Sequence, residues 1–139
     1  MAIPALISHR MIKTFSKEER LCSKKLIDQL FHSSSSFIVY PFRYVYQPIE
    51  DTGTPYPVQV IISVSKRRFK RAHDRNRIKR LTREVYRLQK SEYLYTHLQQ
   101  SSLNLLLAVQ YVGKAELAYD VLFAKMNKGL TQLVNELSS

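Results

Sequence analysis

The chain has 139 residues, of which 45% are hydrophobic, and it carries a formal net charge of +11. This length predicts a single domain over residues 1–139, and the hydrophobic fraction excludes a disordered tail. No apolar run approaches the ~18 residues of a membrane-spanning helix. The single cysteine, Cys22, cannot form a disulfide within the chain, which fits a reducing cytosol and predicts a cytoplasmic protein.

A short helix is predicted after an irregular N-terminal stretch, residues 1–14. Ser23 can act as the N-cap of a helix over residues 23–31, because a serine hydroxyl accepts a hydrogen bond from the free N–H groups of a first turn. The apolar residues of this segment recur with helical spacing and share one face. They are Leu26, Ile27, Leu30 and Phe31.

Extended structure is predicted next. Residues 37–47 are rich in Tyr, Phe and Val, with Pro41 either splitting the strand or marking a sheet edge. Residues 48–57 contain Gly53 and several prolines and are predicted to form a loop. Along residues 58–65, side chains alternate between an apolar face and a mostly small or polar face. The apolar face holds Val58, Val60, Ile62 and Val64, and the other holds Gln59, Ile61, Ser63 and Ser65.

The C-terminal part predicts a helix, a strand and a second helix. Residues 91–100 favour a short helix, and residues 103–112 alternate as a strand with one apolar side. Residues 117–137 form an amphipathic pattern, although Gly129 weakens the helix propensity inside it. Because helices and strands interleave, the fold class is α/β or α+β, with helices packed on the apolar face of a sheet.

Nearly all of the excess charge lies in residues 66–90. This segment has twelve Lys or Arg and two acidic residues, whereas the other 114 residues carry ten basic and nine acidic residues. Positive charge concentrated in this way indicates a polyanionic partner. Arg outnumbers Lys eight to four in the segment, and the planar guanidinium suits bidentate contacts with phosphates.

The basic segment has helical period from Asp74 onward. Its apolar residues fall on one arc, and its cations with Asn76 fall on the opposite arc. Asp74 is expected to cap the helix, and Glu84 to pair with Arg80 or Arg87. The apolar arc holds Ile78, Leu81, Val85 and Leu88, and the opposite arc holds Asn76, Lys79, Arg80, Arg83, Arg87 and Lys90.

A solvated charged face is the alternative interpretation of this arc. Solvated helical faces usually mix charges of both signs, whereas these cations have no interleaved acid and repel one another unless a polyanion neutralises them. A membrane surface is disfavoured, because the apolar arc is narrow and is needed against the sheet. The segment therefore predicts a nucleic-acid interface.

The order of short motifs resembles the bacterial ribonuclease P protein family. The run SVSKR at residues 63–67 ends a predicted strand and is followed by RNRIKR at 75–80 and RE at 83–84. FSKEERL at 15–21 and the predicted helix over 23–31 resemble the N-terminal part of that family. The chain departs from the family pattern at Phe69, where a glycine is usual, at His73, where a small apolar residue is usual, and at Ile27, where an aromatic is common.

The resemblance implies a fold that composition and periodicity do not specify. It is an α+β, two-layer sandwich of αβββαβα order, with a mixed sheet of about four strands and helices packed on one face. It also implies a left-handed βαβ crossover through the basic helix, against the usual right-handed rule.

The resemblance further implies a subunit of ribonuclease P, in which a catalytic RNA removes the 5′ leader of precursor tRNA. Mg²⁺ would be held mainly by the RNA subunit and the substrate, and the protein would act as a monomer within the holoenzyme. The residues expected to bind RNA are Lys66, Arg67, Arg68, Lys70, Arg71, Arg75, Asn76, Arg77, Lys79, Arg80, Arg83 and Arg87. Those expected to line a groove for the leader are Ile27, Phe31, Phe42, Tyr44 and Tyr46, with core packing as the alternative for these aromatics.

No catalytic or metal-binding constellation is predicted on the protein itself. The four histidines are scattered without metal-ligand spacing, and the motifs of common hydrolases and nucleotide-binding proteins do not occur. An autonomous two-metal nuclease would need clustered carboxylates, which the basic segment lacks. A general RNA- or DNA-binding protein of ribosomal or nucleoid type remains the alternative function.

Overall fold

The computed structural model describes residues 14–32 and 35–138. The stretch predicted to be irregular, residues 1–14, therefore lies outside the described residues except for Thr14. The described elements, in chain order, are the 3-10 turn η1 (Lys17–Glu19), α2 (Lys24–His32), β1 (Ser35–Val39), β2 (Phe42–Ile49), β3 (Val58–Val64), α3 (Ala72–Lys90), the π-helical turn η2 (Ser91–Tyr95), α4 (Thr96–Gln100), β4 (Asn104–Tyr111) and α5 (Tyr119–Leu137).

The strands form one mixed sheet in the order β1-β2-β4-β3. β2 is antiparallel to both β1 and β4, whereas β3 and β4 are parallel neighbours joined through α3. The α+β fold class and the four-stranded mixed sheet are thereby confirmed. The left-handed sense of the crossover stays a prediction.

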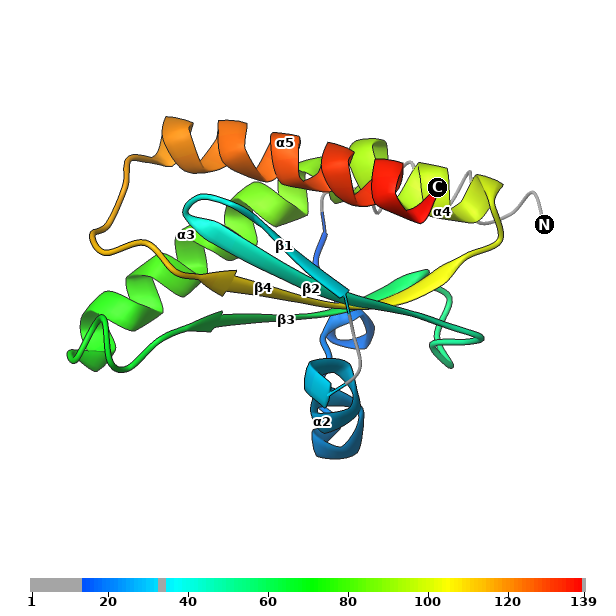
Figure 1. Ribbon diagram of the computed structural model, residues 1–139, viewed down its shortest axis with the longest axis horizontal. Coiled ribbons are helices and arrows are strands. Elements are labelled where there is room, and N and C mark those ends of the chain that lie inside the picture. Colours follow the sequence, from blue (N-terminus) through cyan, green and yellow to red (C-terminus); the bar gives the residue numbers. More distant parts are fainter. Residues whose placement is uncertain (1–13, 33–34, 139) are drawn as a thin grey trace.

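Helices cover both faces of the sheet, and not one face as expected. Figure 1 shows α3 and α5 on one side and α2 on the other. The main hydrophobic core lies under α3 and α5 and includes Phe42, Tyr86 and Leu107. A smaller cluster, which includes Leu30 of α2 and Ala108 of β4, fills the opposite side. On this second face, polar and apolar residues alternate along the strands. The face therefore has only a small apolar patch, and α2 packs on it.

Sequence signals account for the start of α2 and for the β1–β2 turn. The backbone N–H of Leu26 donates to the Ser23 hydroxyl at 3.3 Å, which confirms the predicted N-cap. The predicted extended segment is split at Pro41, since β1 ends at Val39 and β2 begins at Phe42. β2 then continues through residues 48 and 49, which were predicted to start the following loop.

The helical segment after β3 is longer than predicted. Residues 91–100 do not form a separate helix, because the backbone stays helical at both Ser91 and Thr96, where α3, η2 and α4 join. α5 likewise runs through Gly129 without a break. A Cβ atom at Gly129 would lie 2.1 Å from the Tyr44 ring, so the glycine lets α5 approach the sheet closely.

Candidate nucleic-acid interface

The turn over residues 65–71 connects β3 to α3 and is held by hydrogen bonds at its base. The Phe69 N–H donates to the Ser65 carbonyl at 3.1 Å, and the Arg67 N–H donates to the Ser65 hydroxyl at 3.2 Å. Arg75 donates to the carbonyls of Phe69 and Lys70 at 2.7 and 2.8 Å. These contacts fix the turn's backbone and assign Arg75 a structural role in addition to its charge.

Phe69 packs inward from the turn. Its ring meets Tyr111 of β4 edge to face, with 5.9 Å between ring centroids. The other long side chains of the turn project into solvent, because the aromatic anchor and the backbone hydrogen bonds leave them no place in the core. These exposed residues are Lys66, Arg67, Arg68, Lys70 and Arg71.

α3 is amphipathic as predicted. Ile78 and Val85 are fully buried against the sheet, whereas Asn76 and Arg80 are exposed. Leu81 and Leu88, predicted for the buried arc, are only partly covered. Buried residues that the apolar pattern missed are Thr82, Tyr86 and Gln89, because polar and amphipathic side chains carry no strong hydrophobic signal.

The helix start differs from the prediction for Asp74. The N-cap position is Arg71, so Asp74 does not cap the helix but lies in its first turn. It forms an ion pair with Arg77 at 3.3 Å. An acidic side chain there is still favourable, because the N-terminal end of a helix carries partial positive charge.

Two arginines of α3 are partly neutralised by acids of the protein. Arg77 lies 2.8 Å from Glu116, and this hydrogen bond raises the pKa of the arginine. Arg87 lies 2.6 Å from Glu84, and the hydrogen bond lowers the pKa of the carboxyl group. Of the two partners predicted for Glu84, Arg87 is the one it binds.

The other predicted RNA-binding cations have no ion pair with any acidic side chain in the part of the chain that the structure describes. The turn and the outward side of α3 therefore form one surface of largely uncompensated positive charge, which we call the basic surface. It consists of Lys66, Arg67, Arg68, Lys70, Arg71, Arg75, Asn76, Arg77, Lys79, Arg80, Arg83 and Arg87.

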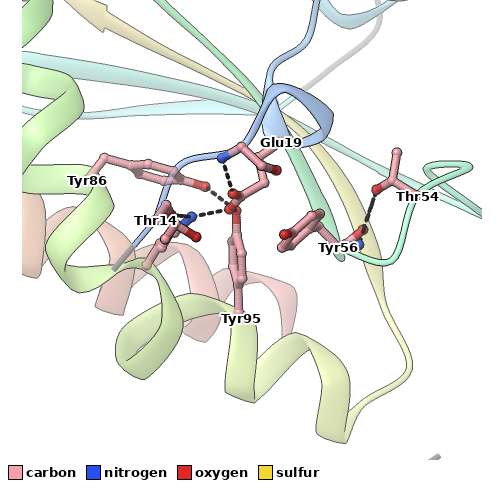
Figure 2. Close-up of polar contacts among 8 residues, drawn as sticks. Thr14, Glu19, Thr54, Tyr56, Tyr86 and Tyr95 are labelled. Carbon is pink, nitrogen blue, oxygen red and sulfur yellow. Dashed lines mark hydrogen bonds and ion pairs between the residues drawn. The ribbon is translucent and has the colours of Figure 1, made fainter. Parts of the chain in front are cut away.

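Lys90 does not belong to the cationic arc on which its spacing placed it. It is fully buried, its ammonium group forms an ion pair with Glu19, and it also donates to the Thr14 carbonyl. The Tyr95 hydroxyl donates to the same Glu19 carboxylate at 2.6 Å. Burial lowers the pKa of Lys90, and the hydrogen bond to Glu19 opposes that shift. Figure 2 shows Glu19 beside Thr14 and Tyr95, so this network fastens the N-terminal segment to the end of α3.

The prediction that Phe42, Tyr44 and Tyr46 line an open groove is wrong. Their relative exposures are 0%, 0% and 8%, and all three lie in the main core on the face covered by α3 and α5. The register decides this outcome, because Phe42 pairs with Tyr111 and Tyr44 pairs with Val109, which both belong to that core. The alternative of core packing is correct for these three aromatics.

α2 carries the other two predicted groove residues, and both remain accessible. Phe31 is 42% exposed, and Ile27 is partly buried beside the smaller hydrophobic cluster. Both lie on the helix that covers the second face of the sheet. They are thus on the opposite side of the sheet from Phe42, Tyr44 and Tyr46.

A mostly polar row on this second face was missed by sequence reasoning. Ile38, Arg43, Gln110 and Ser63 lie opposite one another across the four strands. Arg43 donates to the Gln110 side chain at 2.7 Å. The alternation of Arg43 and Gln47 with aromatics was the available signal. We call this row, together with Ile27 and Phe31, the open face.

Comparisons with known proteins match the chain over most of its length. The family model described as Ribonuclease P matches residues 15–134. The ribonuclease P protein component of Porphyromonas gingivalis is 35% identical over 124 residues, covering 89% of each chain. The chain belongs to the ribonuclease P protein family. The corresponding protein of Chlorobium phaeobacteroides is 36% identical over 109 residues, covering 73% of this chain and 74% of that protein.

Solved ribonuclease P proteins share the fold. The structure from Thermotoga maritima matches with a TM-score of 0.64 at 18% identity, covering 82% of this chain and 96% of that one. The structure from Staphylococcus aureus matches with a TM-score of 0.60 at 16% identity, covering 83% and 94%. The predicted αβββαβα order is therefore that of known ribonuclease P proteins.

The chain is thus a protein subunit of ribonuclease P, the ribonucleoprotein endoribonuclease that processes the 5′ end of tRNA. Membership of this holoenzyme implies a catalytic RNA partner. Among the helices of the described residues, none has the length and apolar character to cross a membrane. Within residues 14–32 and 35–138, no three His, Cys, Asp or Glu side chains gather as a metal site would require.

Proposed function

We propose that this ribonuclease P subunit binds the catalytic RNA through the basic surface. The observation that carries the proposal is the set of cations on the 65–71 turn and α3 that have no acidic partner in the described chain. Their mutual repulsion is relieved when phosphates neutralise them and counterions are released. Asn76 and the exposed arginines add hydrogen-bond donors that can fix the orientation of an RNA backbone.

The same proposal assigns the single-stranded 5′ leader of precursor tRNA to the open face. Phe31 offers a ring on which a base can stack, and stacking tolerates any base because every base has a π-face. Arg43 is held in place by Gln110 and offers a cation to a leader phosphate. The row that contains Arg43 and Gln110 ends at Ser63, two residues before the basic turn. A bound strand can therefore pass from the open face to the basic surface.

Catalysis is assigned to the RNA subunit, with Mg²⁺ held mainly by the RNA and the substrate. The two acidic side chains of α3 next to the basic surface are both paired, since Asp74 pairs with Arg77 and Glu84 pairs with Arg87. No chemical step is therefore assigned to a protein residue. The protein's contribution is to neutralise phosphates and orient the leader, which strengthens binding of substrate and metal.

Three further features complete the proposal. The protein acts as one domain over residues 1–139, as a monomer within the holoenzyme, and in the cytoplasm. The continuous sheet and the two clusters that pack on its faces support the single domain. The single cysteine supports a reducing compartment.

Reconstitution tests the function directly. Bacterial ribonuclease P RNA is mixed with the purified protein at low Mg²⁺, and cleavage of precursor tRNA is followed at increasing protein concentration. We expect the protein to restore 5′-leader removal that the RNA alone performs poorly under these conditions. Unchanged cleavage across the concentration range would leave only a general nucleic-acid-binding role. Cleavage by the protein without RNA would instead indicate an autonomous nuclease.

A further inference from the structure

A small cleft lies beside the basic surface, on the edge of the sheet next to β3. Its volume is about 150 Å³, and it is lined by Phe15, Arg20, Ile61 and Arg83, among others. The lining residues come from the N-terminal segment, β3 and α3, which are far apart in the sequence. One water molecule occupies roughly 30 Å³ in the liquid, so the cleft has room for a phosphate group.

Two guanidinium groups of like charge face this cleft without a counter-ion. Neither Arg20 nor Arg83 forms an ion pair with an acidic side chain of the described residues. Their acidic sequence neighbours are occupied elsewhere, since Glu19 binds Lys90 and Glu84 binds Arg87. The residues outside the described ranges, 1–13, 33–34 and 139, contain no Asp or Glu that could supply the missing side-chain charge.

The fold holds Arg20 in this position by several contacts. Arg20 forms a β-bridge with Val60, and the next residue, Leu21, donates its N–H to the Val60 carbonyl at 2.8 Å. Its guanidinium lies over the Phe15 ring, 5.3 Å from the centroid. The preceding residue, Glu19, is fixed by the buried ion pair with Lys90. The backbone of Arg20 is therefore fixed, and its guanidinium is held toward the cleft by the contact with the Phe15 ring.

The electrostatic consequence appears at Arg83. Partial burial and the nearby Arg20 guanidinium lower the pKa of Arg83, which means that its positive charge, still present at neutral pH, is destabilised in the free protein. A bound anion removes this penalty, because it attracts both guanidiniums and replaces their repulsion. Arg83 also belongs to the basic surface, so an anion in the cleft would extend that surface to Arg20.

We infer that the Phe15–Arg20–Arg83 cleft binds one backbone phosphate of the catalytic RNA, shared between the two arginines. The inference rests on the proposed function, since it assigns the RNA as the source of the phosphate. It adds Arg20, which lies outside the basic segment, to the RNA interface. Two planar guanidiniums converging on one site favour a phosphate, which accepts several hydrogen bonds at once.

The salt dependence of RNA binding tests the shared phosphate. The dissociation constant for ribonuclease P RNA is measured from low to moderate salt for the full-length protein and for Arg20→Gln, Arg83→Gln and the double variant. Each single variant should weaken RNA binding but reduce the slope of log K against log salt by less than about 1, because the remaining arginine still neutralises the shared phosphate. The double variant should reduce the slope by about 1, the contribution of one phosphate, because no arginine then remains in the cleft.

The control is Lys128→Gln, an exposed residue of α5 that lies outside the cleft and the basic surface. It should leave the slope unchanged, and backbone amide NMR spectra confirm that each variant is folded. A loss of about 2 in the double variant would show two separate phosphates and overturn the inference. An unchanged slope in the double variant would overturn it as well. If the wild-type protein does not bind the RNA, the proposed function and this inference fail together.

Discussion

At the scale of single residues, Lys90 shows that the fold can bury a cation whose helical spacing predicts a position on the charged surface. Its spacing continues the cationic arc of α3, yet its ammonium group contacts Glu19, 71 residues away in the sequence. A helical projection cannot show this partner, because it contains only neighbours along one helix. Burial of the pair follows from the N-terminal segment, which lies across the end of α3 and excludes water.

Substitution of Lys90 tests how much this network contributes to the stability of the fold. Lys90→Met keeps the length of the side chain but leaves the Glu19 carboxylate buried without its cation. Removal of one partner of a buried ion pair typically costs 3–5 kcal/mol, so we expect the free energy of unfolding to fall by about that amount. Urea denaturation measures it.

Two comparisons identify the cause of that loss. Lys128→Met, at an exposed site of α5, should change stability by no more than about 0.5 kcal/mol. The double variant Glu19→Gln/Lys90→Met should lose less than Lys90→Met alone, because no unpaired charge remains buried. A Lys90→Met protein as stable as the wild type would contradict the role assigned to the pair.

Tyr44 gives a prediction on pH. Burial raises its pKa well above the ordinary 10.0, so the folded state keeps the phenol proton that the unfolded state loses above pH 10. Stability from this residue is therefore complete below pH 10 and falls as pH rises further, by about 1.4 kcal/mol at pH 11. Tyr44→Phe should reduce the difference in unfolding free energy between pH 8 and pH 11 by that amount. Equal pH dependence of the two proteins in urea denaturation would refute the prediction.

The residue-scale errors of sequence reasoning share a physical origin. Tyr44 and Tyr46 are amphipathic, so an aromatic on a strand is compatible with either a nucleic-acid groove or a core. The decision comes from register across strands, in which Tyr44 lies opposite Val109. Arg43 was overlooked for the same reason, because the sequence alone does not show whether the odd-numbered or the even-numbered residues of β2 face α3 and α5.

At the scale of elements, α5 depends on Gly129, although alanine has the higher helix propensity. Gly129→Ala should gain up to about 1 kcal/mol from propensity. Its new methyl group would, however, lie 2.1 Å from the Tyr44 ring, and overpacking of this kind costs about 1–3 kcal/mol. We expect a net loss of stability in urea denaturation. The matched control is Ala124→Gly in the same helix, an exposed site that should lose about 1 kcal/mol through propensity alone. A stabilised Gly129→Ala protein would show that α5 can shift away from the sheet.

α2 carries the prediction for the leader. Phe31→Ala should weaken holoenzyme binding of precursor tRNA by about 1–3 kcal/mol, the value of one lost base stack, with little change for mature tRNA. Dissociation constants for both substrates measure the difference. Phe123→Ala on α5, where the side chain has similar exposure, should affect neither. An equal loss for both substrates would point to damage of the hydrophobic cluster under α2.

The elements themselves were largely predictable. The alternation in residues 58–65 and 103–112 identified β3 and β4, and the spacing in residues 117–137 identified α5, each within about two residues. Such patterns are local and follow directly from the period of the backbone. The continuous passage from α3 through α4 and the position of α2 on the second face were not predictable. Both depend on contacts between distant segments, such as Leu30 with the patch of β2 and β4.

At the scale of the whole molecule, the position of the charge carries more information than its sum. The protein has a net charge of +11, but residues 66–90 account for most of it, and the fold gathers them on one turn and one side of one helix. If net charge alone governed RNA binding, removal of any two cations would weaken binding equally. If the basic surface makes the contacts, only cations on that surface should matter.

Two double variants that lose the same amount of positive charge distinguish these two cases. Arg67→Gln/Arg80→Gln and Lys125→Gln/Lys128→Gln each remove two positive charges, the first from the basic surface and the second from α5. We expect the first to flatten the slope of log K against log salt for ribonuclease P RNA by about 2, since each arginine neutralises about one phosphate. The second should leave the slope close to that of the wild type. Equal flattening in both variants would mean that the RNA responds to the overall field of the protein, and that the turn and α3 are not its specific contact.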